Sequence, residues 1–253
     1  MEATVGLWMM ALASVGYGGA ALFSVAQLYR PHIERWTFAW ASLGWFGETL
    51  WLFHHGHAAR FLVTRDGTVS MMVWLLVALF FLAQRSSLRT CGSFLLPVGF
   101  VLWAIDRVMA AALPPLMLFN GGWRAHVVWA LVVAGVMSFV LAAVFAIMYL
   151  EKERELKQRR VRLFYYRLPA LEALDRAMGR ALTAGFGIMT GAGLVVLSGF
   201  LAHGEPWRVE LLWALYALIA AVRYPGHWRG PRLASLTMVA SLAVVAYVFG
   251  APT

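Results

Sequence analysis

The sequence predicts an all-α integral membrane protein, a bundle of about eight transmembrane helices with both termini outside the cytoplasm. Apolar residues make up 62% of the 253 positions, and only 13% are charged. A soluble domain is typically about half apolar and a quarter charged, so the excess apolar surface faces lipid. Soluble enzyme folds, nucleic-acid-binding modules and disulfide scaffolds are excluded, the last because Cys91 is the only cysteine.

Each predicted span is an apolar stretch close to the roughly 20 residues that a helix needs to cross a bilayer. The first stretch follows Glu2 rather than a basic run and is too long for a signal peptide, so we expect it to remain a span. Inside the bilayer a helix satisfies its own backbone hydrogen bonds, which makes the other stretches helices as well. In order, the stretches are residues 7–28, 36–55, 69–84, 93–112, 126–150, 182–202, 208–223 and 234–251.

The basic residues fall mainly on one side of the predicted membrane. The links after the first, third, fifth and seventh helices hold 16 of the 21 Lys and Arg, the other links hold four, and Arg107 lies within a span. Cytoplasmic links carry the excess of basic residues. The sequence therefore predicts a multi-pass membrane protein with both termini outside the cytoplasm.

Residues 151–181 form the one long connection in what we expect to be a single polytopic membrane domain covering residues 1–253. Its first half, EKERELKQRRVR, continues the fifth helix as a charged stalk of this basic cytoplasmic loop. Four apolar residues then recur at spacings of three and four: Leu171, Leu174, Met178 and Leu182. This pattern predicts an amphipathic helix on the inner membrane surface, which binds either the lipid bilayer or a cytoplasmic partner.

Three charged residues lie within the predicted spans: Glu48, Asp106 and Arg107. Such residues usually face the bundle interior or a polar cavity, so each is a candidate site residue. Glu48, Trp51 and His55 follow one helical stripe. A protonated, hydrogen-bonded Glu48 without further function is the alternative. Arg107 is expected either to snorkel to the surface or to pair with an anionic group of a ligand.

Five of the seven histidines lie at helix ends on the predicted outer side. They are His54, His55 and His57 after the second stretch, His126 at the start of the fifth, and His203 after the sixth. Neutral imidazole binds haem iron and zinc, and two histidines at equal depth on separate helices are what a b-type haem requires. Histidine at this level is also often simply hydrated, so the residues alone leave haem, zinc and hydration open.

The glycines of GFGIMTGAG, residues 185–193, are not expected to form a nucleotide-binding loop, because no strand precedes them and they lie within a span. Gly187 and Gly191 form a GxxxG pair, which predicts close helix packing.

Several segments occur in one characteristic order. The fifth helix opens with His126 and leads into YLEKERELKQRR, and RLPALEALDR follows at residues 167–176. The later residues of the pattern are Gly185, Phe186, Trp213, Tyr216, Arg223 and the WRG of residues 228–230. Together with His54 and His55 at the end of the second helix, this pattern resembles the cytochrome c assembly protein family, in particular its short HemX-like branch.

The resemblance implies an eight-helix membrane protein that handles haem and is not an enzyme; longer relatives carry haem across the membrane and present it to apocytochrome c. It implies that His126 is an outer-face haem ligand and that His55 or His54 is an intramembrane ligand. This chain departs from the family in two places. The tryptophan-rich WGxxWxWDPKE segment is replaced by AHGEPWRVELLW, and Ala221 stands where a second intramembrane histidine is expected.

We therefore expect one b-type haem near the outer face, with His126 and His55 as axial ligands of the iron. Further cofactor-binding candidates are His54, His203 and, for a haem propionate, Arg124 or Arg107. The expected partners are other cytochrome c assembly proteins or apocytochrome c, and no nucleic acid.

Two alternatives stand beside this prediction. The first is a haem-free membrane regulator of haem biosynthesis that acts on a cytoplasmic partner through residues 151–181; the resemblance suggests glutamyl-tRNA reductase as that partner. The second is a small-solute transporter that uses Glu48 and Asp106 as intramembrane carboxylates.

Overall fold

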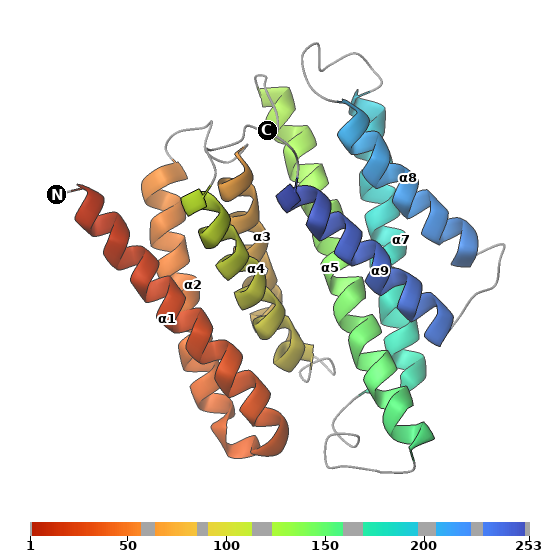
Figure 1. Cartoon of the computed structure of the whole chain (residues 1–253), viewed down its shortest axis with the longest axis horizontal. Helices are drawn as coiled ribbons and strands as arrows, with labels where there is room; N and C mark the ends of the chain where they lie inside the picture. Colours follow the sequence, from red (N-terminus) through yellow and green to blue (C-terminus); the bar gives the residue numbers. More distant parts are fainter. Residues whose placement is uncertain are drawn as a thin grey trace. The chain divides into compact units, whose positions relative to one another are not determined.

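The computed structural model describes residues 2–56, 64–84, 91–112, 123–158, 169–196, 206–223 and 230–250. These ranges form eight α-helices and one short 3-10 helix, η1, and contain no strand (Figure 1). The elements are α1 (Glu2–Tyr29), η1 (Pro31–Ile33), α2 (Glu34–Gly56), α3 (Arg65–Ala83), α4 (Gly92–Ala112), α5 (Trp123–Lys157), α7 (Leu171–Val195), α8 (Pro206–Arg223) and α9 (Pro231–Gly250). The all-α prediction is confirmed, and each of the eight apolar stretches overlaps one of the α-helices.

Four of the helices contain segments long and apolar enough to cross a membrane. These segments are Val5–Gln27, Asp66–Ala83, Gly92–Ala111 and His126–Lys157. In a membrane, a helix that satisfies its own backbone hydrogen bonds can expose such a surface to lipid without a penalty. The length and composition of these helices therefore indicate a membrane protein with several transmembrane helices.

The described chain divides into two compact units. The first unit contains η1 and helices α1 to α4. In this unit α1 packs against α2 and α4, and α3 packs against α2 and α4, which gives a closed four-helix arrangement (Figure 1).

Glycines bring the backbones of α1 and α2 close together. Gly16 lies directly against the backbone of Gly44, and a Cβ added at Gly47 would lie 2.8 Å from the amide nitrogen of Ala13. In a membrane, where lipid is as apolar as a leucine side chain, small residues drive helix association by permitting this close approach. The close packing of α1 on α2 in the first unit therefore depends on glycine at these positions.

Polar side chains connect α2 to α3. The indole of Trp74 donates a hydrogen bond of 2.8 Å to the hydroxyl of Thr49, and its ring stacks on Trp45 with 5.0 Å between centroids. Thr64 is the N-cap of α3, since its hydroxyl accepts a hydrogen bond of 3.2 Å from the amide of Gly67. This cap satisfies one of the free amides in the first turn of the helix.

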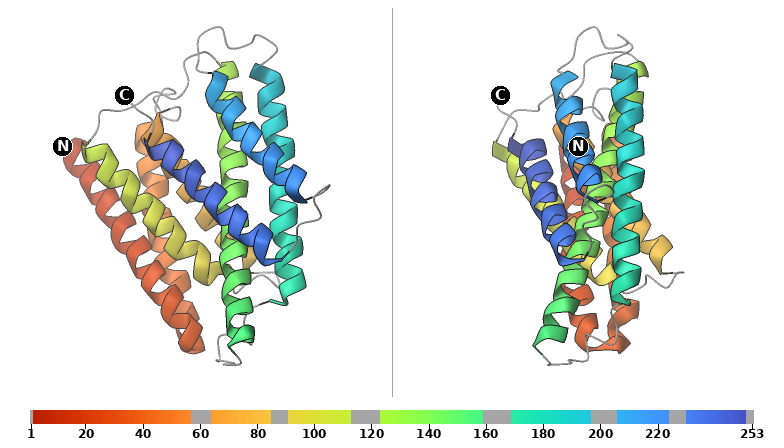
Figure 2. Two further views of the ribbon diagram at one scale, coloured as in Figure 1. Left: turned by 45° about the vertical axis from the view of Figure 1, so that its right-hand side comes forward. Right: turned by 90° about the vertical axis from the view of Figure 1, so that its right-hand side faces the viewer.

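The second unit contains α5, α7, α8 and α9. Helices α5 and α7 run side by side, α8 packs against α7, and α9 packs against α5 (Figure 2). Tyr216 of α8 reaches α5, where its hydroxyl donates a 2.6 Å hydrogen bond to the carbonyl of Gly135 and its ring contacts Phe139. Ser241 of α9 donates to the carbonyl of Phe139 over 3.3 Å. The middle of α5 is therefore held by α8 and α9 through specific polar contacts.

The segment predicted as a basic loop with a surface helix has a different arrangement in its described part. Helix α5 continues to Lys157, so the charged residues after Leu150 are helical up to that residue. The predicted amphipathic helix is the first part of α7, which starts at Leu171 and continues to Val195. Its apolar residues Leu174, Met178 and Leu182 are buried. A surface helix and a packed helix have the same apolar period, so the pattern alone does not separate them.

The close packing of α7 uses other glycines than the predicted pair. No described atom would lie within 4 Å of a Cβ added at Gly187 or Gly191. Gly185 instead lies against the tip of Tyr216, and Gly179 lies against the guanidinium of Arg223. Within the described residues, the prediction of close packing at Gly187 and Gly191 is therefore wrong. The close contact is made by Gly185, two residues before Gly187.

Candidate functional site

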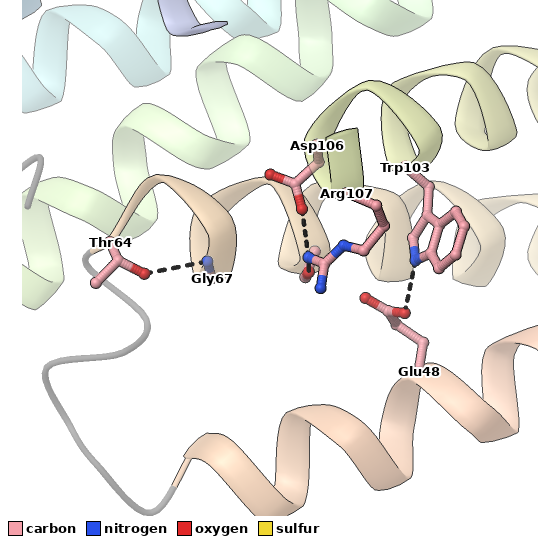
Figure 3. Close-up of polar contacts among 7 residues, drawn as sticks. Glu48, Thr64, Gly67, Trp103, Asp106 and Arg107 are labelled. Carbon is pink, nitrogen blue, oxygen red and sulfur yellow. Dashed lines mark hydrogen bonds and ion pairs between the residues drawn. The ribbon is translucent and has the colours of Figure 1, made fainter. Parts of the chain in front are cut away.

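The first unit encloses a cluster of polar and charged side chains, shown in Figure 3. Glu48 comes from α2, Ser70 from α3, and Trp103, Asp106 and Arg107 from α4. Glu48 is 2% exposed and Asp106 is fully buried. Charged groups inside a membrane bundle are costly unless they are paired, so their contacts define what this cluster can do.

Arg107 is the centre of the cluster. Its Nη2 donates a hydrogen bond of 2.8 Å to the hydroxyl of Ser70, and it forms an ion pair with the carboxylate of Asp106. The guanidinium also lies over the ring of Trp51, 4.6 Å from the centroid, which is a cation–π geometry. Of the two expectations for Arg107, the surface-directed one does not hold, because the side chain turns into the bundle and is only 16% exposed.

Glu48 faces the same region from α2. The indole of Trp103 donates a hydrogen bond of 3.0 Å to Oε2 of Glu48, and the edge of the Tyr17 ring lies against Trp103 at 6.2 Å. Figure 3 shows the Glu48 carboxyl pointing toward Trp103 and Arg107. Arg107 also lies over the ring of Trp51. Glu48 and Trp51 therefore face the same neighbours, as expected for two residues on one helical stripe.

The cluster contains more hydrogen-bonding capacity than it uses. Among the described atoms, Oε1 of Glu48, Oδ1 of Asp106, the hydroxyl of Tyr17 and Nε of Arg107 are buried without a hydrogen-bond partner. Buried polar atoms are satisfied in the large majority of cases, and exceptions point to a functional role or a bound species. The arrangement can hold a small polar species or a proton.

The candidate histidines are distributed over both units. His54 is exposed near the end of α2 in the first unit, and His126 is half-buried in the first turn of α5 in the second. His55 also lies in α2, and Arg124 in α5, but their side chains are not among those described. His203 lies outside the described ranges. Each residue is therefore located within its own unit, and the pairing of His126 with His55 stays a prediction.

Among the side chains that the structure describes, no three of the types His, Cys, Asp and Glu gather as a metal site. A haem iron needs only two axial side chains from the protein, so this finding does not bear on the haem prediction.

In the second unit, several residues of the family-like sequence pattern lie close together, on α7, on α8 and at the start of α9. Arg223, at the end of α8, approaches the carboxylate of Asp175 at 3.7 Å, and the amide of Gly230 donates to the same carboxylate over 3.4 Å. Gly230 has a φ of +69°, a conformation that favours glycine. Asp175 therefore ties the end of α8 and the start of α9 to α7.

A second set of contacts lies further along α7. The indole of Trp213 donates to the hydroxyl of Thr190 over 3.1 Å, and its ring lies 6.1 Å from that of Phe186. Gly185, next to Phe186, receives the tip of Tyr216. We call the residues Asp175, Gly185, Phe186, Trp213, Tyr216, Arg223 and Gly230 the motif network.

Sequence reasoning identified the charged members of the first-unit cluster but missed Tyr17, Ser70 and Trp103. Trp103 lies one turn before Arg107 on the same helix, so the spacing places both on one face. Tyr17 and Ser70 carry no such signal, because their role depends on contacts between helices.

Comparison of the chain with models of known protein families, with curated proteins and with solved structures finds no match.

Proposed function

We propose that this chain is a haem-handling membrane protein of the cytochrome c assembly type, with eight spans and both termini outside the cytoplasm. In this proposal it holds one b-type haem near the outer face of the bacterial cytoplasmic membrane, and it retains or delivers that haem within an assembly complex.

The observation that carries the proposal is the motif network. Its seven residues were singled out as elements of one family-like pattern, and they are spread over a segment of nearly 60 positions, from Asp175 to Gly230. In the structure they link α7, α8 and the start of α9 through direct contacts. Residues that share a pattern by chance have no reason to meet, so this convergence supports the resemblance.

The network also fixes the helix that opens with His126. Tyr216 hydrogen-bonds the carbonyl of Gly135, nine residues after His126 and about 13 Å further along α5. An axial ligand needs a defined position, and a helix held at its middle provides one. The imidazole of His126 is half-buried, which shields it in part from water.

The residues present have the donor chemistry that a b-type haem needs. His126 and His55 would supply neutral imidazoles to the iron, with His54 and His203 as further candidates. Arg107 is engaged by Asp106 and Ser70, so we assign the propionate to Arg124. The haem, when bound, supplies an electron-accepting iron; the protein supplies orientation and shielding from water.

The ligand assignment predicts a loss of haem from single variants. We expect His126→Ala and His55→Ala each to reduce bound haem at least tenfold, because a low-spin site loses half of its protein ligation. His32→Ala is the matched control, since His32 is exposed in η1 and lies on the opposite predicted side. Haem is measured per chain after purification in detergent, together with the yield of folded protein. Full haem in the His126→Ala, His55→Ala double variant would refute the assignment.

A second candidate function is the haem-free regulator. The observation that favours it is a group of exposed basic residues at one end of the second unit, where Lys152 of α5 hydrogen-bonds the carbonyl of Pro169 just before α7. The exposed residues are Arg154, Lys157, Arg176 and Arg180, of which Lys157 pairs with Glu153 at 2.8 Å and Arg176 approaches Glu172 at 3.9 Å. Such a surface suits an acidic protein partner, for which we keep glutamyl-tRNA reductase as the candidate, or anionic lipid.

A further inference from the structure

The charged cluster of the first unit has an unbalanced charge. Glu48 and Asp106 are two carboxyls, and Arg107 is the one cationic side chain in contact with them in the described structure. If both carboxyls were ionised, the cluster would carry a net charge of minus one inside the bundle. A net charge in such an environment is far more costly than a neutral, hydrogen-bonded acid.

The contacts separate the two carboxyls. Asp106 forms the direct ion pair with Arg107, which stabilises its ionised form. Glu48 accepts a hydrogen bond from the neutral indole of Trp103 and is also stabilised by the neutral hydroxyl of Ser70, whereas Arg107 acts on it only through space. Its other oxygen, Oε1, is buried without a partner among the described atoms. Glu48 is therefore the member of the pair with less compensation for a negative charge.

Titratable groups on α1 and α3 also face the two carboxyls. The phenol of Tyr17, a group that is uncharged at neutral pH, faces Glu48 from α1. Asp66, in the first turn of α3, is a third carboxyl and interacts electrostatically with Asp106. Together with the members of α2 and α4, the facing titratable groups comprise three carboxyls, one phenol and one guanidinium. This composition favours the uptake of a positive species.

We propose that Glu48 is the proton-binding site of the first unit, and that Asp106 remains ionised beside Arg107. On uptake, a hydronium ion gives one proton to a carboxylate oxygen of Glu48, an O–H bond forms, and water is released. The cluster then changes from a net charge of minus one to zero.

Every group that takes part in this proton uptake belongs to helices α1 to α4, so the uptake is independent of haem binding. The first unit thus has a binding function of its own, the reversible uptake of one proton, which is the elementary step of any proton-coupled process in a membrane.

The test is infrared difference spectroscopy of the full-length protein, purified in detergent and titrated with acid in heavy water. A protonated carboxyl has a carbonyl band that a carboxylate lacks. At neutral pH we expect the unchanged protein to show one such band, and the Glu48→Gln variant to lack it. We expect Asp106→Asn to abolish it as well, because Glu48 then becomes the only counter-ion for Arg107 and loses its proton. Arg107→Gln should about double the band, because both carboxyls become protonated.

Glu210→Gln is the control, because Glu210 is an exposed carboxyl on α8 in the other unit; its band should equal that of the unchanged protein. Carbon-13 labelling of the glutamate carboxyls tests the assignment without any variant, since it shifts a band that belongs to glutamate. A band that does not shift on labelling, or that persists in folded Asp106→Asn, overturns the proposal, as does the absence of a band at neutral pH. A shifted band that is lost in Asp106→Asn supports it.

Discussion

Gly16→Ala should destabilise the protein strongly. Gly16 of α1 lies against the backbone of Gly44 on α2, and the backbone around Leu43 lies 3.0 Å from the position that a Cβ would take. A clash with backbone cannot be relieved by a rotamer change, so the two helices must separate. Overpacking of this kind costs about 1–3 kcal/mol or more. We expect a loss of at least about 2 kcal/mol in the free energy of unfolding, measured as a lower midpoint of thermal unfolding in detergent.

Gly18→Ala is the matched control, two residues further along the same helix. A Cβ there would meet Phe100 at 3.5 Å, which is ordinary van der Waals contact. Alanine is the better helix former by up to about 1 kcal/mol, so Gly18→Ala should leave the protein unchanged or slightly more stable. Equal unfolding midpoints for the two variants would contradict the packing of α1 on α2 described above.

Gly185→Ala should have the second large effect, this time in the motif network. The added methyl group would occupy the space of the Tyr216 hydroxyl. Tyr216 cannot easily move, because Phe139 contacts its ring at 3.7 Å between centroids. The variant therefore loses the hydrogen bond to Gly135, worth about 1 kcal/mol, and gains the cost of overpacking. We expect a loss of about 2–3 kcal/mol, followed by thermal unfolding and by the near-ultraviolet circular dichroism of the buried aromatic side chains.

Gly187→Ala provides the comparison for this prediction. No described atom would lie within 4 Å of its methyl group, so the variant should be as stable as the unchanged protein or slightly more so. If Gly187→Ala were the more damaging variant, the GxxxG prediction from the sequence would be right, and the contact found at Gly185 would not be the one that holds α7.

The helices were predictable because lipid imposes a simple rule on the sequence. Each apolar stretch lies within one α-helix or overlaps it, and the helix starting at His126 was expected within three residues of its observed start. A helix near Leu171 was predicted, but its packed environment and its continuation to Val195 were not, because Leu174 and Met178 show the same period whether they face lipid headgroups or another helix. Only the packing partner decides between these environments, and the sequence of one helix does not contain it.

The candidate site divides in the same way. Glu48, Asp106 and Arg107 were identified one by one, since a charged residue in an apolar stretch is conspicuous. Their association could not be predicted, because it requires knowing that α2 and α4 belong to one four-helix unit. Trp103 shows the same limit: tryptophan is common in membrane proteins, and its role as the donor to Glu48 follows only from the contact itself.

The visible absorption spectrum of the detergent-purified protein is the direct test of haem binding by this chain. Spectra are recorded oxidised and after reduction with dithionite, with haem supplied during expression and quantified per chain. We expect the sharp reduced bands of a low-spin bis-histidine b-type haem, at about one haem per chain. A folded preparation without a Soret band would contradict it, and would leave the regulator with its exposed basic surface as the better proposal.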